Sequence, residues 1–200
     1  MLLKNFIKMT IACTMLLAPA ITRANEVATV AFLAAIKVAQ VQAIRATADY
    51  YQAIGVGVEA QQTTGLANRL ESGSLGGEDS IQAFQSATNS LKARIDDYRA
   101  RGKIPTAQQL EMARKAKAKL DTANVALGVA IAAGVIAATN GGNFIEKLAK
   151  AAIFTGIALK MTQPFGAARE AARQYNELKL SGETGFQDIS KGLEPAFIDL

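Results

Sequence analysis

The stretch from Thr122 to Ile145 reads TANVALGVAIAAGVIAATNGGNFI and contains no charged residue. No helix breaker precedes the Asn-Gly-Gly turn signal at 140–142, so the stretch predicts an unbroken helix over 122–139, about 27 Å long. Small residues recur at every fourth position of this helix, where they form a groove that lets another helix approach closely. We therefore predict a helix-packing interface made by Ala126, Ala130, Gly134 and Ala138.

A second apolar helix is predicted after this turn. Asn143 can cap its first turn, and the apolar pattern continues to about Met161. Pro164 is expected to end that pattern and to permit a further helix over 166–180. The segment 122–161 is thus predicted to form a long apolar helical hairpin.

Two interpretations of this hairpin stay open. In the first, it is the buried centre of a water-soluble bundle. In the second, it enters or lies on a membrane. We favour the first, because alanine and glycine supply little transfer energy to lipid. The first helix of the hairpin has only six large aliphatic residues, and the return helix has four charges, at Glu146, Lys147, Lys150 and Lys160.

The rest of the chain is also predicted to be helical. Helices are expected over 26–54 and 58–71. A third helix is expected to follow, with the side chain of Asp79 or Ser80 capping its first turn. Gly102 fits the left-handed stop of that helix, and Thr106 with Gln109 matches a capping box that starts the next one. The apolar faces repeat at spacings of three and four. They comprise Val27, Val30, Ala34, Lys37, Val41, Ile44, Ala48 and Tyr51 in the first helix, and Ile81, Phe84, Thr88, Leu91, Ile95 and Tyr98 in the third.

These patterns predict an all-α fold, an elongated bundle of five or six helices. We expect one helical domain over 25–182 and an irregular C-terminal tail over 183–200. The tail mixes glycine, proline and acidic residues with a few apolar ones. A mature chain of this length can bury enough surface for one core without disulfides.

Residues 1–24 read as a secretory signal peptide. Lys4 and Lys8 give a positive start, an apolar run follows, and small residues precede a cut after Ala24. The alternative is an uncleaved anchor helix, although the apolar run is short for a membrane span. The sequence therefore predicts a periplasmic or secreted protein.

Composition argues against catalysis. The chain has no histidine, and its single cysteine, Cys13, lies in the leader. A serine–histidine triad, a thiolate nucleophile and an ordinary zinc site are therefore absent from the mature chain. No P-loop or dinucleotide-binding motif occurs. We predict a protein that is not an enzyme, with no cofactor, no metal site and no catalytic residue.

A basic segment precedes the apolar hairpin. Its candidate surface comprises Arg94, Arg99, Arg101, Lys103, Arg114, Lys115, Lys117 and Lys119. Such a surface suits anionic headgroups or an acidic protein, or it is simply a solvated face partly paired through Glu111 and Lys115. Without the leader the chain has 22 − 3 = 19 basic and 17 acidic residues, a net charge of +2. Nucleic acid is therefore not an expected partner.

Together these features favour a non-enzymatic exported interaction or structural protein of the cell envelope. In its size and all-helical character the chain resembles the small exported accessory subunits of secretion machinery. The resemblance is one of general class and includes no shared motif. The expected partner is a protein of the envelope. The alternative function is a membrane-active or lipid-binding protein that uses the 122–161 hairpin. The sequence leaves the oligomeric state open.

Overall fold

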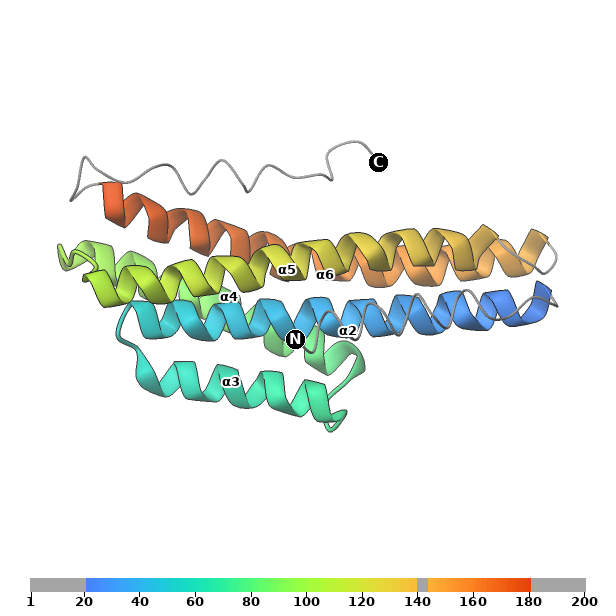
Figure 1. Cartoon of the computed structure of the whole chain (residues 1–200), viewed down its shortest axis with the longest axis horizontal. Helices are drawn as coiled ribbons and strands as arrows, with labels where there is room; N and C mark the ends of the chain where they lie inside the picture. Colours follow the sequence, from blue (N-terminus) through green and yellow to red (C-terminus); the bar gives the residue numbers. More distant parts are fainter. Residues whose placement is uncertain (1–20, 140–143, 181–200) are drawn as a thin grey trace. The chain divides into compact units, whose positions relative to one another are not determined.

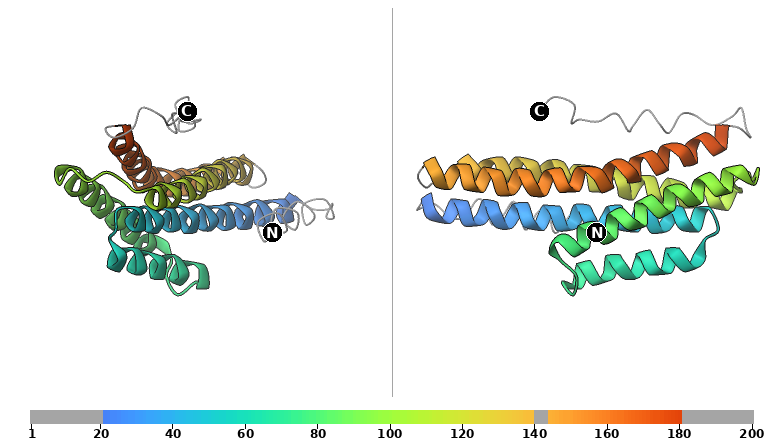
Figure 2. Two further views of the ribbon diagram at one scale, coloured as in Figure 1. Left: turned by 60° about the vertical axis from the view of Figure 1, so that its left-hand side comes forward. Right: turned by 180° about the vertical axis from the view of Figure 1, so that it is seen from behind.

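A computed structural model describes residues 21–139 and 144–180, with side chains over 27–139 and 145–178. The described residues form an all-α fold of five helices without a strand (Figures 1 and 2). This confirms the predicted fold class and the predicted number of helices. The helices are α2 (Ile21–Ala53), α3 (Gly57–Ser72), α4 (Gly77–Ala100), α5 (Ala107–Thr139) and α6 (Phe144–Leu180). The predicted cap Asn143 and the predicted tail 183–200 lie outside the described residues.

Two helix boundaries follow the predicted chemistry. Gly102 adopts a φ of 63°, the left-handed conformation that ends a helix, directly after α4 and its C-cap. Before α5, the Thr106 backbone N–H donates to Gln109 Oε1 at 2.8 Å, and the Gln109 N–H donates to Thr106 Oγ1 at 3.3 Å. This reciprocal pair is the predicted capping box, and it satisfies N–H groups that the first turn of α5 leaves free.

The predicted side-chain cap of α4 is wrong. The helix begins at Gly77 with Gly76 as its N-cap, and no side chain accepts a cap hydrogen bond. Ser80 lies in the first turn, where its hydroxyl donates to the Gly77 carbonyl at 2.7 Å. Asp79 also lies in this turn, where its negative charge favours the helix N-terminus without capping it.

The predicted break at Pro164 is also wrong, because α6 runs through this proline without interruption. Proline removes one backbone hydrogen bond from a helix and crowds the preceding turn. Pro164 is buried, and so are Met161 and Phe165 on either side of it. Burial of this apolar segment offsets the local cost of the proline, and the helix continues.

The chain forms two compact units, and α2, α5 and α6 contribute to both. Unit 2 comprises residues 37–125 and 160–180 of the described chain. Its core includes the predicted face of α4, of which Phe84, Leu91 and Ile95 are fully buried. The Phe84 and Phe165 rings meet edge to face with centroids 5.5 Å apart, so α4 packs on the second half of α6.

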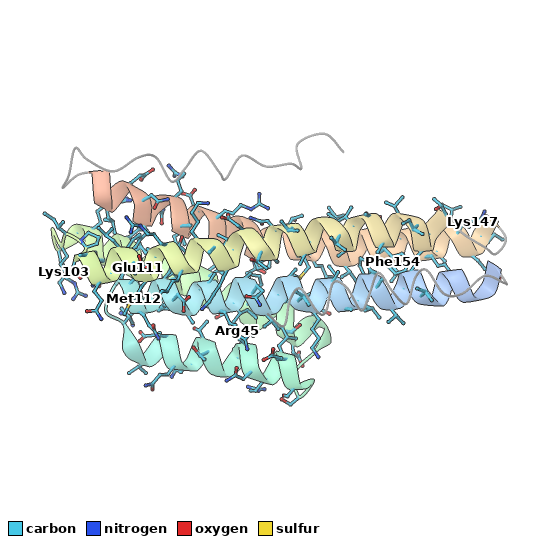
Figure 3. All side chains as sticks on the ribbon, viewed as in Figure 1. Arg45, Lys103, Glu111, Met112, Lys147 and Phe154 are labelled. Atoms are coloured by element: carbon cyan, nitrogen blue, oxygen red, sulfur yellow. The ribbon has the colours of Figure 1, made fainter. Side chains whose placement is uncertain are left out.

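Unit 1 comprises residues 21–36 of α2, 126–139 of α5 and 144–159 of α6. Among the side chains described there, the buried apolar ones are four alanines and four larger residues, namely Ala28, Ala130, Ala133 and Ala137 with Phe32, Ile36, Leu127 and Phe154. The Phe32 and Phe154 rings meet with their centroids 4.7 Å apart. Phe154 is labelled in Figure 3. The predicted face of α2 is therefore only half right. Ile44 and Tyr51 are buried in unit 2, whereas Val30 is exposed in unit 1.

Candidate interaction surface

The small residues of α5 lie on the inner side of unit 1. Ala130 and Gly134 are buried, and Ala126 and Ala138 are half-buried. A Cβ atom added at Gly134 would lie 3.1 Å from Cδ2 of Phe32 and 3.4 Å from Cβ of Phe154. Any larger residue here would press on the Phe32 ring, which would have to shift by a few tenths of an ångström, so Gly134 permits the close approach of the three helices.

The large aliphatic residues of α5 mostly point the other way. Of the six in its apolar half, only Leu127 is buried, and Ile131 is half-buried. The remaining four are at least half exposed, namely Val125, Val129, Val135 and Ile136. The prediction that the hairpin forms the buried centre of a soluble bundle is therefore wrong for these side chains. Because the alanine face packs inward, the larger residues remain outside.

The other two helices of unit 1 bury larger residues, namely Phe32 and Ile36 on α2 and Phe154 on α6, but they also expose large aliphatic ones. Ten of the thirteen exposed large apolar residues in the described chain belong to this unit, so the exposure is concentrated there. They are Val27, Val30 and Leu33 on α2, Val129, Val135 and Ile136 on α5, and Ile145, Leu148, Ile153 and Leu159 on α6. We call this set the apolar belt.

Charge is nearly absent from unit 1. Within 27–36, 126–139 and 144–159 the only charged residues are Glu146, Lys147 and Lys150. The two lysines precede Phe154 by seven and four residues, so they share its inward face and are half-buried. The outward face of α6 that carries Ile153 is apolar from residue 151 to 159, and the exposed Glu146, seven residues before Ile153, marks its charged beginning.

The predicted basic surface is largely neutralised in unit 2. Six of its eight residues form ion pairs with nearby carboxylates. The pairs are Arg94–Glu59, Arg99–Glu177, Arg101–Asp97, Arg114–Glu111, Lys117–Asp121 and Lys119–Asp49. The predicted pairing of Glu111 with Lys115 is replaced by its pairing with Arg114. Lys103 lies over the Tyr98 ring, 5.8 Å from the centroid, and Lys115 is exposed. These basic residues therefore present little unopposed charge.

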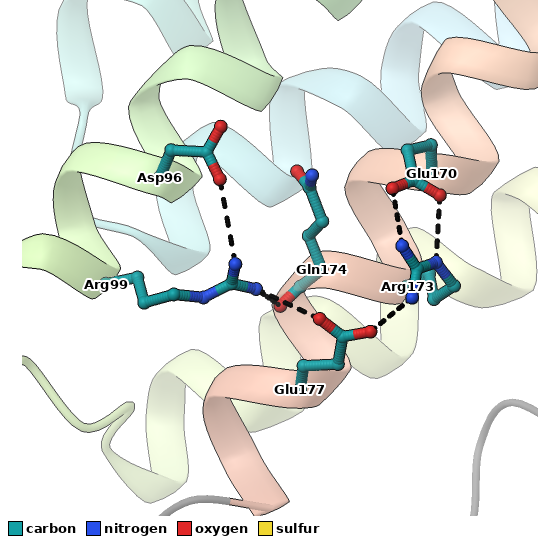
Figure 4. Close-up of polar contacts among 6 residues, drawn as sticks. All are labelled: Asp96, Arg99, Glu170, Arg173, Gln174 and Glu177. Atoms are coloured by element: carbon teal, nitrogen blue, oxygen red, sulfur yellow. Dashed lines mark hydrogen bonds and ion pairs between the residues drawn. The ribbon is translucent and has the colours of Figure 1, made fainter.

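A chain of ion pairs joins α4 to α6 (Figure 4). Arg99 on α4 reaches Glu177 at 3.2 Å and also donates to the Gln174 carbonyl. Arg173 contacts both Glu177 and Glu170, the latter at 2.6 Å. The hydrogen bond from Arg173 holds the pKa of the Glu170 carboxyl below its ordinary value. Sequence spacing within α6 could have suggested the Arg173 pairs, but not the long-range link to Arg99.

No group of three or more metal-binding side chains is found among the described residues. Two helical stretches, Val27–Ala53 and Ala107–Thr139, are long and apolar enough to cross a membrane, judged by length and composition alone. An N-terminal apolar helix of this kind fits either a signal sequence or a membrane span. The predicted cut after Ala24 falls within α2, four residues after its start.

The fold and the surface define an all-α helical protein whose exposed apolar residues gather in one three-helix unit. Comparisons with protein-family models, curated proteins and solved structures find no match.

Proposed function

We propose that this protein is a non-enzymatic, exported interaction or structural protein of the cell envelope. It acts through the apolar belt of unit 1. The observation that carries the proposal is the concentration of exposed large apolar side chains on a unit with almost no charge. Exposed apolar patches of this kind mark interaction sites in soluble proteins. The leader-like segment 1–24 supports export to the periplasm or beyond.

The apolar belt favours binding of a partner on an exposed surface over catalysis in a pocket. Enzymes bring polar and titratable groups together in a concave site. The outward faces of unit 1 carry mostly aliphatic side chains instead, which offer apolar area to a partner, and Glu146 is the one exposed charged side chain described there. Service as an accessory subunit of secretion machinery is one role of this kind.

Cell fractionation tests the proposal. The unsubstituted chain should be recovered with the envelope, and a variant with Val129→Ser and Ile153→Ser should move to the soluble fraction. These two residues are 56% and 60% exposed. Val58 and Ile104 of unit 2 are 66% and 62% exposed, so Val58→Ser with Ile104→Ser is a matched control that should stay with the envelope.

Two results would contradict the proposal. The first is recovery of the unsubstituted chain in the cytoplasm or as a freely soluble protein. The second is equal release by the control pair, because the apolar belt would then have no special part in the attachment.

A further inference from the structure

We infer that the partner of the apolar belt is the hydrocarbon of a lipid membrane, which unit 1 enters without crossing. This inference rests on the proposed function and names the partner of the same surface. It is carried by three observations about unit 1, namely where its large residues lie, how far around the unit they extend, and how long its uncharged segments are.

The first observation is the inverted order of side-chain sizes. Ala130, Ala133, Gly134 and Ala137 of α5 are buried, whereas Val129, Val135 and Ile136 on the same helix are exposed. Water-soluble bundles bury their large aliphatic residues, because that burial drives their folding. In lipid, helices instead associate through small residues that permit close packing, and large apolar residues face the acyl chains. The α5 helix follows the second pattern over most of its length in unit 1, whereas α2 and α6 contribute the larger Phe32, Ile36 and Phe154 to the core and expose further aliphatic residues.

The second observation is that every helix of unit 1 has an outward apolar face. The exposed residues include Leu33 on α2, Val129 on α5 and Ile153 on α6. A typical protein partner covers about 800 Å² on one side of a molecule. Faces on three packed helices point in different directions, so one such partner leaves part of the belt in water. A lipid phase can cover all of them at once.

The third observation limits the depth of insertion. Uncharged residues on α2 extend from Val27 to Ile36, about 15 Å, and those on α6 extend from Ala151 to Leu159, about 14 Å. The hydrocarbon core of a bilayer is about 30 Å thick. Lys37 and Lys160 follow these segments directly along α2 and α6. Lysine is costly at the bilayer centre, so Lys37 and Lys160 limit the insertion to about one leaflet, even though α5 is itself uncharged over about 27 Å.

The charged residues near the loop end of unit 1 are compatible with this placement. Lys147 and Lys150 lie on the inward face of α6 and are half-buried, whereas Glu146 is exposed. Charged residues therefore flank the uncharged segment 151–159 at both ends, so unit 1 has to lie along the interface with both ends at the headgroups. The long lysine side chains can extend to anionic headgroups at the interface. Anionic lipid should therefore strengthen an attachment that neutral lipid already supports.

Single tryptophan reporters provide the test, because the native chain contains no tryptophan. Val129→Trp and Ile153→Trp place the reporter on the belt, and Val58→Trp is the matched control in unit 2. The purified proteins are mixed with vesicles of phosphatidylcholine, with or without phosphatidylglycerol. We expect a blue shift at positions 129 and 153 and quenching by lipids brominated in the upper acyl chain. No shift is expected at position 58.

Flotation of the unsubstituted protein with the same vesicles keeps the test independent of how the variants fold. The protein should float with both lipid compositions, and Ile153→Ser should lower the partition coefficient about 10- to 100-fold. Val58→Ser should leave the partition coefficient unchanged.

Four results would overturn the inference. They are failure of the unsubstituted protein to float, an equal blue shift at position 58, quenching that is strongest at the bilayer centre, and a concentration-dependent blue shift without vesicles. The last result would assign the belt to a second copy of the chain. Failure to float, combined with envelope attachment that depends on Val129 and Ile153 in cells, would leave the proposed function intact and assign the belt to a protein partner.

Discussion

Replacing Gly134 with leucine tests the packing of unit 1 directly. The Cβ of the new side chain would already lie 3.1 Å from Cδ2 and 3.3 Å from Cε2 of Phe32. Phe32 is fully buried and its ring packs at a tilt of 59° against the Phe154 ring, so moving it aside disturbs that contact. The remaining three carbon atoms of leucine therefore have to displace the ring.

The expected loss of stability is the balance of two effects. Overpacking a close contact costs about 1–3 kcal/mol, and partial exposure of Phe32 forfeits part of the roughly 1.5–3 kcal/mol that its burial contributes. Leucine regains about 1 kcal/mol over glycine in a helix interior. We expect a net destabilisation of about 1–3 kcal/mol. In a chain of this size each kcal/mol lowers the thermal midpoint by about 2–4 °C.

Thermal unfolding followed by circular dichroism measures this difference. Gly156→Leu is the matched control, because no atom lies within 4 Å of a Cβ built at Gly156. The control should be as stable as the native chain or more stable by up to about 1 kcal/mol. The reasoning is refuted if Gly134→Leu unfolds at or above the native midpoint, or if both variants lose equal stability.

Four further results are expected. Thr106→Ala removes half of the capping box and should lower the free energy of unfolding by about 0.5–2 kcal/mol in denaturant titrations. Tyr51→Phe should cost about 1 kcal/mol, because the hydroxyl donates to the Ala87 carbonyl at 2.9 Å, whereas Tyr175→Phe should cost nothing, since its buried hydroxyl has no partner among the described residues. The pKa of Glu170 is lowered, so its ion pair stabilises the fold above the ordinary value of 4.5 and the stabilisation is lost as pH falls through the lowered pKa. Unfolding midpoints measured against pH should therefore fall less steeply on acidification in Glu170→Gln than in the native chain. Mass spectrometry of the exported protein should find Asn25 as its first residue, and an intact Met1 on envelope protein would contradict cleavage after Ala24.

Local chemistry made much of the helical fold predictable. The capping box at Thr106 and the left-handed Gly102 are determined by a few neighbouring residues, so the sequence alone reveals them. The three-four face of α4 was predictable for a related reason. Its apolar residues occupy one side only, and Leu91 and Ile95 therefore had to face the core.

Only part of the packing of the apolar hairpin could be predicted. The four-residue spacing of small residues predicted that Ala130 and Gly134 lie at a helix contact, and both are buried. Both faces of α5 are apolar in unit 1, so periodicity does not say that Val129 on the other face stays uncovered. That outcome depends on the neighbouring helices. The continuation of α6 through Pro164 could not be predicted either. It depends on the burial of Met161 and Phe165, which tertiary packing decides and local sequence does not.

The exposure of large apolar residues on unit 1 has a consequence for the lifetime of the chain. A segment that leaves such residues in water has less burial to hold it closed, so its local opening gives amide exchange and proteolysis an early route. Any partner that covers the folded unit, but not its opened form, stabilises it by mass action. The amount of intact protein in a cell should therefore follow the amount of that partner. The rate at which the chain is degraded would then report what fraction of the chains has unit 1 covered.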